Sequence, residues 1–86
     1  MNSTYQLTLS RNAVKYMGKQ EKSVQERIRR ALLGLSVHPP IGDIKLMKGY
    51  EKQFRLRVGS YRILFEVNHQ ERMVYILVID NRGDVY

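Results

Sequence analysis

The stretch QFRLRVGSYRILFE, residues 53–66, determines more of the fold than any other part of the chain. Gly59-Ser60 predicts a two-residue hairpin turn with glycine at the first central position, as a type II′ turn prefers. Such a turn fixes the register of the two strands outward from it. The predicted pairs are Val58–Tyr61, Arg57–Arg62, Leu56–Ile63, Arg55–Leu64, Phe54–Phe65 and Gln53–Glu66.

Strand alternation divides these pairs between two faces. One face is wholly apolar and is expected to cover the helices, while the other gathers Arg55, Arg57 and Arg62. Like charges opposite each other destabilise a sheet, and guanidinium groups match phosphate oxygens with paired hydrogen bonds. The pattern therefore predicts an anion site. The alternative is an ordinary exposed face that Glu66 partly neutralises.

The first half of the chain predicts a strand and two helices. Tyr5–Leu9 alternates like a half-buried strand, and Ser10 is a good N-cap for a helix from Arg11 to about Lys19. Ser23–Glu26 fits a capping box at the start of a second helix that ends near Ser36.

Proline and glycine mark the connection to the second half. His38-Pro39-Pro40 stops the second helix, and Ile41–Tyr50 is predicted to be a loop. Strands are expected at Lys52–Val58, Tyr61–Asn68 and Met73–Asp80. The order predicts one α+β domain over residues 1–86: an N-terminal strand, a helical hairpin and a three-stranded antiparallel meander, with the helices packed on one face of the sheet.

Composition narrows the classes of partner. The chain has 86 residues, 43% of them hydrophobic, and a formal net charge of +7, which favours a polyanionic partner. Cysteine is absent, which excludes disulfides and thiolate metal sites. Asn2–Ser10 does not resemble a signal peptide, and the apolar run Met73–Ile79 is far shorter than the roughly 18 residues that span a bilayer. We therefore expect a cytoplasmic protein without membrane contact.

The remaining polar candidates predict no metal or cofactor. His38 and His69 fall in loops and are expected to be solvated, and no spacing of His, Asp or Glu fits a metal site. No small-molecule ligand is expected either. Lys45 and Lys48 are either solvated loop lysines or auxiliary contacts to the polyanionic partner.

Three segments together resemble the RelE/ParE toxin superfamily over essentially the whole chain. They are GDIKLMKG at residues 42–49, FRLRVGSYRILFEV at 54–67 and RGDVY at 82–86. The resemblance implies a toxin of a type II toxin–antitoxin system with a RelE-like fold. It further implies a metal-independent endoribonuclease that cleaves mRNA in the ribosomal A site by attack of the 2′-hydroxyl. Its implied partners are the ribosome, mRNA and a cognate antitoxin protein.

The resemblance also implies the residues of the site. It assigns catalysis to the three arginines Arg55, Arg62 and Arg82 and to Tyr86. The RNA-binding candidates beside them are Gln53, Arg57, Lys45 and Lys48.

Two departures from the family pattern keep alternatives open. Gln53 stands where many relatives have a lysine, and Asn81 stands where several have a histidine. The identity of the general base is therefore open. The alternatives are a ParE-like toxin that inhibits DNA gyrase and a catalytically inactive nucleic-acid-binding relative.

Overall fold

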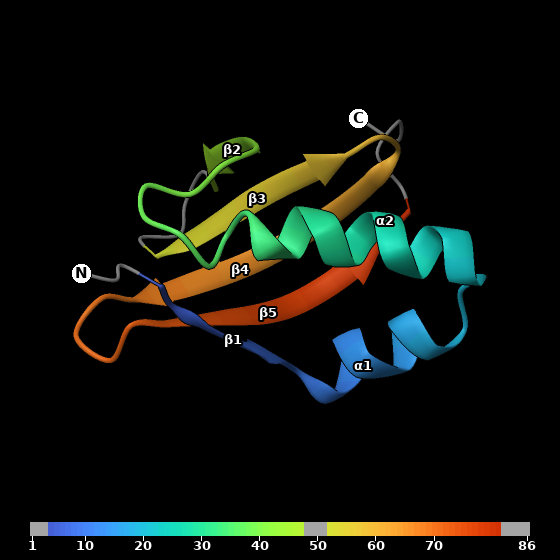
Figure 1. Cartoon of the computed structure of the whole chain (residues 1–86), viewed down its shortest axis with the longest axis horizontal. Helices are drawn as coiled ribbons and strands as arrows, with labels where there is room; N and C mark the ends of the chain where they lie inside the picture. Colours follow the sequence, from blue (N-terminus) through green and yellow to red (C-terminus); the bar gives the residue numbers. More distant parts are fainter. Residues whose placement is uncertain (1–3, 48–51, 82–86) are drawn as a thin grey trace.

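The computed structural model describes residues 4–47 and 52–81 of the chain. Its elements are β1 (Gln6–Leu9), α1 (Arg11–Gly18), α2 (Lys22–Leu33), β2 (Asp43–Leu46), β3 (Gln53–Val58), β4 (Tyr61–Asn68) and β5 (Met73–Asp80). The strands form one sheet in the order β1-β5-β4-β3-β2, and α2 crosses in front of the sheet over β4 (Figure 1). The predicted α+β class is confirmed.

The hairpin of β3 and β4 has the predicted register in all six pairs, from Val58–Tyr61 out to Gln53–Glu66. Gly59 has a φ of 61°, and Arg72 is the only non-glycine residue with a positive φ in the described ranges. Ser60 therefore has a negative φ, which fits a type II′ turn and not a type I′ turn. A Cβ on Gly59 would also meet the guanidinium of Arg27 on α2, but this flexible side chain can move aside. The positive φ is therefore the reason that the turn favours glycine.

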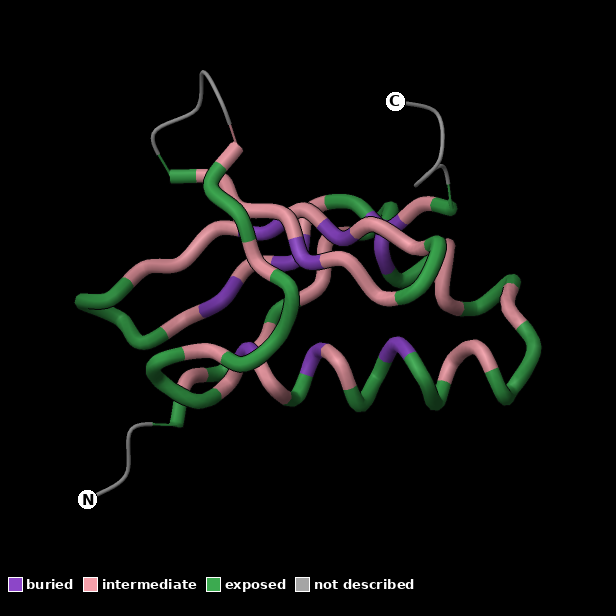
Figure 2. The backbone as a smooth tube through the Cα atoms, turned by 90° about the horizontal axis from the view of Figure 1, so that it is seen from above, coloured by how far each residue is buried: buried purple, intermediate pink, exposed green. Residues whose placement is uncertain are grey.

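The core lies between the helices and the apolar face of the sheet. From β3 and β4 it takes Leu56, Ile63 and Phe65, each at most 1% exposed. The helical side contributes Ala13, Ile28 and Leu32, followed by Leu35, and β5 contributes Val74, Ile76 and Ile79. Figure 2 shows the buried positions of α2 turned toward the strands. Burying this face leaves the opposite face of the sheet free of helices.

The helix boundaries confirm one predicted cap and correct another. The Ser10 hydroxyl accepts a hydrogen bond from the amide of Ala13 at 3.1 Å, so the predicted N-cap of α1 is confirmed. The predicted capping box at Ser23–Glu26 is wrong. The amide of Gln25 already bonds to the carbonyl of Glu21 at 2.9 Å, so α2 begins at Lys22 and no side chain caps it.

The predicted loop at Ile41–Tyr50 is wrong for Asp43–Leu46, which forms the edge strand β2 and pairs antiparallel with β3. Ile44 and Leu46 do alternate with Asp43 and Lys45, but four residues with so weak a pattern do not form a strand alone. The hydrogen bonds that β3 offers across the edge supply the missing stabilisation. The sheet therefore has one strand more than the sequence predicted in this half.

Candidate nucleic-acid interface

Four cations lie on the face of the sheet that carries no helix. Arg57 pairs directly with Arg62 across β3 and β4, and Arg55 lies two residues before Arg57 on β3. Because these arginines alternate with the buried Leu56 and Ile63, their side chains share the outer face, as predicted. Lys45 of β2 is opposite Arg55 and joins them, although the sequence placed it in a loop.

Two carboxylates flank these cations, and both escaped the sequence analysis. Asp43 of β2 lies 3.7 Å from an Nη of Arg55, and Asp80 of β5 lies 3.5 Å from an Nη of Arg62. The two arginine side chains are only 15% and 12% exposed. The register therefore creates a row of four charged residues across the sheet: Asp43, Arg57, Arg62 and Asp80.

A β-bulge in β5 brings Asp80 to this face. Leu64 pairs with Val78 and Phe65 with Ile76, so Leu77 has no partner on β4. With strict alternation the side chain of Asp80 would lie on the same side of the sheet as the buried Ile76. The extra residue moves each later side chain of β5 to the opposite side. The Ser10 hydroxyl donates a hydrogen bond to the carbonyl of Leu77 at 2.7 Å, which ties the bulge to the start of α1.

The bulge changes which residues of β5 are buried, but the sequence does not show it. Val74, Ile76 and Ile79 are buried, whereas Val78 is 36% exposed, so the apolar alternation breaks after Ile76. An uninterrupted apolar run hides that break, because every residue from Met73 to Ile79 is hydrophobic. Only the hydrogen-bonded register shows where the parity changes.

The centre of the face holds unsatisfied hydrogen-bond donors. The Nε atoms of Arg55 and Arg57 are buried and have no hydrogen-bond partner among residues 4–47 and 52–81. No carboxylate of the described residues forms an ion pair with Arg57. A buried charged donor without a partner is costly, so this geometry favours an anion or water at the centre of the arginine cluster.

Glu66 does not neutralise the arginines, which was the alternative that the sequence left open. Its carboxylate accepts a hydrogen bond from Nε2 of Gln53 at 3.3 Å. On this face the Arg55–Leu64 pair separates that contact from the Arg57–Arg62 pair. The neutralising groups are Asp43 and Asp80 instead. Gln53 lies on the same face as the arginines, but its amide is engaged by this contact.

A tyrosine that the sequence analysis missed also lies on this face. Tyr75 of β5 is opposite Glu66, and its hydroxyl donates a hydrogen bond to Glu71 at 3.2 Å. This hydrogen bond raises the pKa of the Tyr75 phenol, which burial and the charge of Glu71 raise further. Tyr75 is therefore neutral at physiological pH. Its ring is better suited to stack on a nucleobase than its hydroxyl is to abstract a proton.

Burial raises the pKa of the Tyr16 phenol on α1, and the neighbouring Tyr61 and Asp80 raise it further. Tyr16 is therefore uncharged at physiological pH and adds no ion to the face.

Three of the predicted site residues fall outside the described residues: Lys48, Arg82 and Tyr86. Their roles stay predictions. Asn81, the last described residue, is exposed and directly follows β5.

The two histidines gather elsewhere, at the rim of an apolar pocket of about 160 Å³ next to Leu35 and Phe65. His38 and His69 are both exposed and lie 5.3 Å apart between ring centroids. Nδ1 of His69 is 2.8 Å from the hydroxyl of Tyr5.

Within the described ranges no three residues of the types His, Cys, Asp and Glu form a group suited to a metal ion. No helix there is long and apolar enough to cross a membrane.

Comparison with solved structures shows where this fold occurs. A chain of the RelE–RelB complex from Pyrococcus horikoshii OT3 is 24% identical, with a TM-score of 0.80 over 94% of this chain and 98% of that chain. The isolated RelE toxin of E. coli is 21% identical, with a TM-score of 0.77 over 91% of this chain and 84% of that one. Identities at this level show the fold alone, and the fold is that of RelE.

Sequence comparison gives the family. A 26-residue segment is 62% identical to Toxin RelE3 of Methanocaldococcus jannaschii, a match that covers 30% of this chain and 30% of that relative. Residues 9–86 match the family model described as the ParE toxin of the type II toxin–antitoxin system parDE. With a family match over nearly its whole length and a RelE-like structure, the chain belongs to the RelE/ParE superfamily of type II toxin–antitoxin toxins.

Proposed function

We propose that this toxin is a ribosome-dependent endoribonuclease that cleaves mRNA in the A site in the cytoplasm. The observation that carries the proposal is the cluster of Arg55, Arg57 and Arg62 on the helix-free face, with the buried Nε donors of Arg55 and Arg57 unsatisfied among the described residues. A phosphate group supplies the acceptor oxygens that these donors lack. Membership of a superfamily that includes RelE adds to this support.

The proposed reaction is an attack of the 2′-hydroxyl on the adjacent phosphorus. A 2′,3′-cyclic phosphate forms, the bond to the 5′ oxygen breaks, and that oxygen leaves with a proton. Negative charge builds up on the non-bridging oxygens during this step. Arg62 is a fixed cation whose side chain is only 12% exposed, so water screens it little and it is suited to stabilise that charge. Arg55 supports the same phosphate from the neighbouring strand.

We assign Arg82 and Tyr86 to the same reaction on the strength of the family resemblance. Arg82 would add a second cation to the phosphorane, and Tyr86 would act as the general base or stack on a base. A phenol with the ordinary pKa of about 10 is ionised in about one molecule in a thousand at pH 7. Neighbouring guanidinium groups would favour the phenolate and raise that fraction.

The ribosome supplies what this set of residues lacks. Arginine is a poor proton donor at neutral pH, so acid–base catalysis by this face is weak. Holding the 2′-hydroxyl in line with the scissile bond contributes a large part of a rate enhancement. Lys45 and Lys48 are suited to contact the surrounding RNA, with Arg57 anchoring the phosphate.

Primer extension on total mRNA after brief induction of the toxin tests this proposal. We expect cuts that are phased with the reading frame and that disappear when translation initiation is blocked, because cleavage requires RNA held in the A site. A matched induction of the Arg62→Ala variant controls for indirect decay. Intact message in growth-arrested cells would contradict the proposal.

The same experiment tests a second candidate, inhibition of DNA gyrase. The family model that matches residues 9–86 is described as a ParE toxin, which is the observation that favours this candidate. An SOS response together with intact message would support it. Phased cuts without an SOS response would reject it.

We propose a cognate antitoxin protein as the partner of this chain, because the solved relatives include RelE–RelB complexes. With a formal charge of +7 on the toxin, we expect a toxin-binding segment that is net acidic or amphipathic. It should cover the arginine face or displace the C-terminal residues. Hydrogen exchange on the complex measures this, and a complex that leaves Arg55, Arg62 and Tyr86 fully open would contradict this mode of inhibition.

A further inference from the structure

The carboxylates that flank the arginine cluster are arranged as internal counterions. The row across the sheet runs Asp43, Arg57, Arg62 and Asp80, so that a negative charge closes each side of two adjacent positive charges. Asp80 reaches the row only because Leu77 is an extra residue in β5. Bulges re-aim side chains next to functional sites, and this one adds a negative charge to a cationic face.

The two ion pairs have long separations between nitrogen and oxygen. The N–O separations of 3.5 and 3.7 Å exceed the roughly 2.7–2.9 Å of a good charge-assisted hydrogen bond. At these separations the carboxylates attract the guanidinium groups mainly through their charge. A phosphate can make shorter contacts to the guanidinium groups, but the negative charge of the carboxylates repels it as it approaches.

Burial makes the pair at Asp80 the stronger of the two. The side chains of Asp80 and Arg62 are 19% and 12% exposed, whereas that of Asp43 is 61% exposed. Charges that are partly removed from water interact more strongly, because less solvent screens them. Asp80 should therefore oppose an incoming phosphate more than Asp43 does.

We propose that Asp80, assisted by Asp43, is a specificity-determining residue that keeps the arginine face from binding free RNA. The inference rests on the proposed RNA-directed function. A flexible RNA in solution must give up its conformational freedom and also displace the internal carboxylates. An mRNA that the ribosome already holds has lost its conformational freedom beforehand, so it only has to displace the carboxylates. The two carboxylates thus favour the ribosome-bound substrate.

Asp80→Asn tests this on the whole chain. The probe is a short single-stranded RNA that carries 2′-O-methyl groups, so that it cannot be cleaved, and fluorescence anisotropy measures its Kd. We expect binding about tenfold tighter for Asp80→Asn and about twofold tighter for Asp43→Asn, because each removes an opposing charge. The dependence of log Kd on log salt should steepen by about 0.7, the increment for one added phosphate contact on a single strand.

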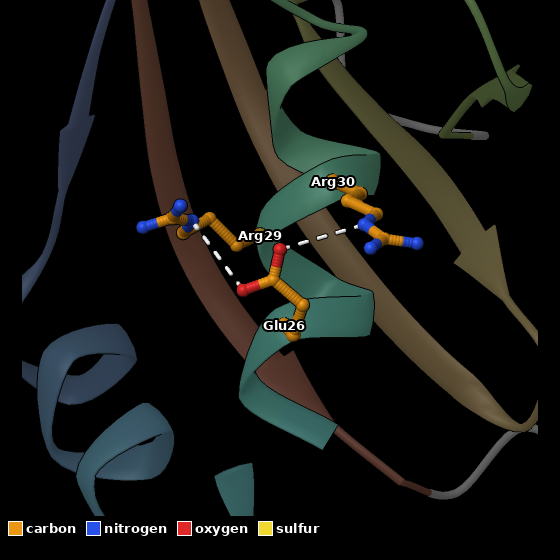
Figure 3. Close-up of polar contacts among 3 residues, drawn as sticks. All are labelled: Glu26, Arg29 and Arg30. Atoms are coloured by element: carbon orange, nitrogen blue, oxygen red, sulfur yellow. Dashed lines mark ion pairs between the residues drawn. The ribbon is translucent and has the colours of Figure 1, made fainter. Parts of the chain in front are cut away.

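Glu26→Gln is the matched control. Glu26 pairs with Arg29 and Arg30 on α2, at 4.0 and 3.4 Å, so this variant removes the same charge and also releases arginines (Figure 3). These arginines are 69% and 77% exposed and belong to a helix, not to the outer face of the sheet. The Kd of Glu26→Gln should differ from that of the wild type by less than twofold. Asp80→Glu should keep the wild-type Kd, because it keeps the negative charge.

The outcomes separate this inference from the proposed function. If Glu26→Gln tightens binding as much as Asp80→Asn, only net charge matters and the inference is wrong. Weaker binding by a folded Asp80→Asn would overturn it as well, since Asp80 would then be needed to position Arg62 for RNA. No measurable binding by either the wild type or Asp80→Asn would also overturn it. Frame-phased cleavage in cells is scored independently of these Kd values, so either idea can fail alone.

Discussion

Arg62→Ala is expected to abolish growth arrest when the toxin is induced without its antitoxin. Arg62 lies opposite Arg57 in the hairpin register, and its side chain is 12% exposed. Removing one fixed donor for the transition-state charge lowers a rate by about 10²–10³-fold, which corresponds to roughly 3–4 kcal/mol. Colony counts after induction, together with cleavage mapping, measure the effect.

The variant must be shown to fold, because Arg62→Ala takes the Arg62 guanidinium away from Asp80. Circular dichroism and binding of the antitoxin provide that check. Arg30→Ala is the matched control, since it removes an equal charge from a 77% exposed position on α2 that pairs with Glu26. It should stay toxic. A folded Arg62→Ala protein that remained fully toxic would show that the proposed site is wrong.

Phe65→Ala is expected to have the largest effect on stability. Phe65 is 1% exposed in the middle of β4, and its ring stacks on Phe54 with 5.5 Å between centroids. Truncating a buried phenylalanine costs about 3–5 kcal/mol from lost burial and the cavity that remains. A domain of 86 residues has only about 4–13 kcal/mol of unfolding free energy in total. Urea unfolding should therefore show a protein that is largely unfolded or has a strongly lowered midpoint.

Leu33→Ala is the control for this change. It also shortens a large apolar side chain, but Leu33 is 54% exposed near the end of α2. Its unfolding free energy should change by no more than about 0.5 kcal/mol, as is usual at exposed positions. Equal destabilisation by the two variants would mean that the buried face of the hairpin is not the centre of the core.

The hairpin shows how far local sequence can go. Gly59-Ser60 predicted the turn type, the turn fixed the register, and alternation then assigned Leu56 to the core and Arg57 to the outer face. Each step uses only neighbours in the chain, because a two-residue turn leaves no freedom in the pairing. The N-cap at Ser10 is predictable for the same reason, since its partner is the amide three residues later.

Two features of the site needed the tertiary structure: the edge strand β2 and the β-bulge in β5. β2 forms because β3 offers it an edge, so Asp43 and Lys45 reach the arginines from what the sequence indicated was a loop. The bulge at Leu77 depends on pairing between β4 and β5 and on the hydrogen bond from Ser10, 67 positions away in the sequence. It alone decides that Asp80 faces Arg62.

The sequence by itself thus determined the α+β class, the hairpin register and the shared face of Arg55, Arg57 and Arg62. The tertiary structure alone decided that Asp43 and Asp80 stand beside those cations. The physical reason is the range of the interactions. Turns, caps and alternation depend on residues close together in the chain, whereas the parity of β5 and the existence of β2 depend on hydrogen bonds to strands that the chain reaches only when it folds.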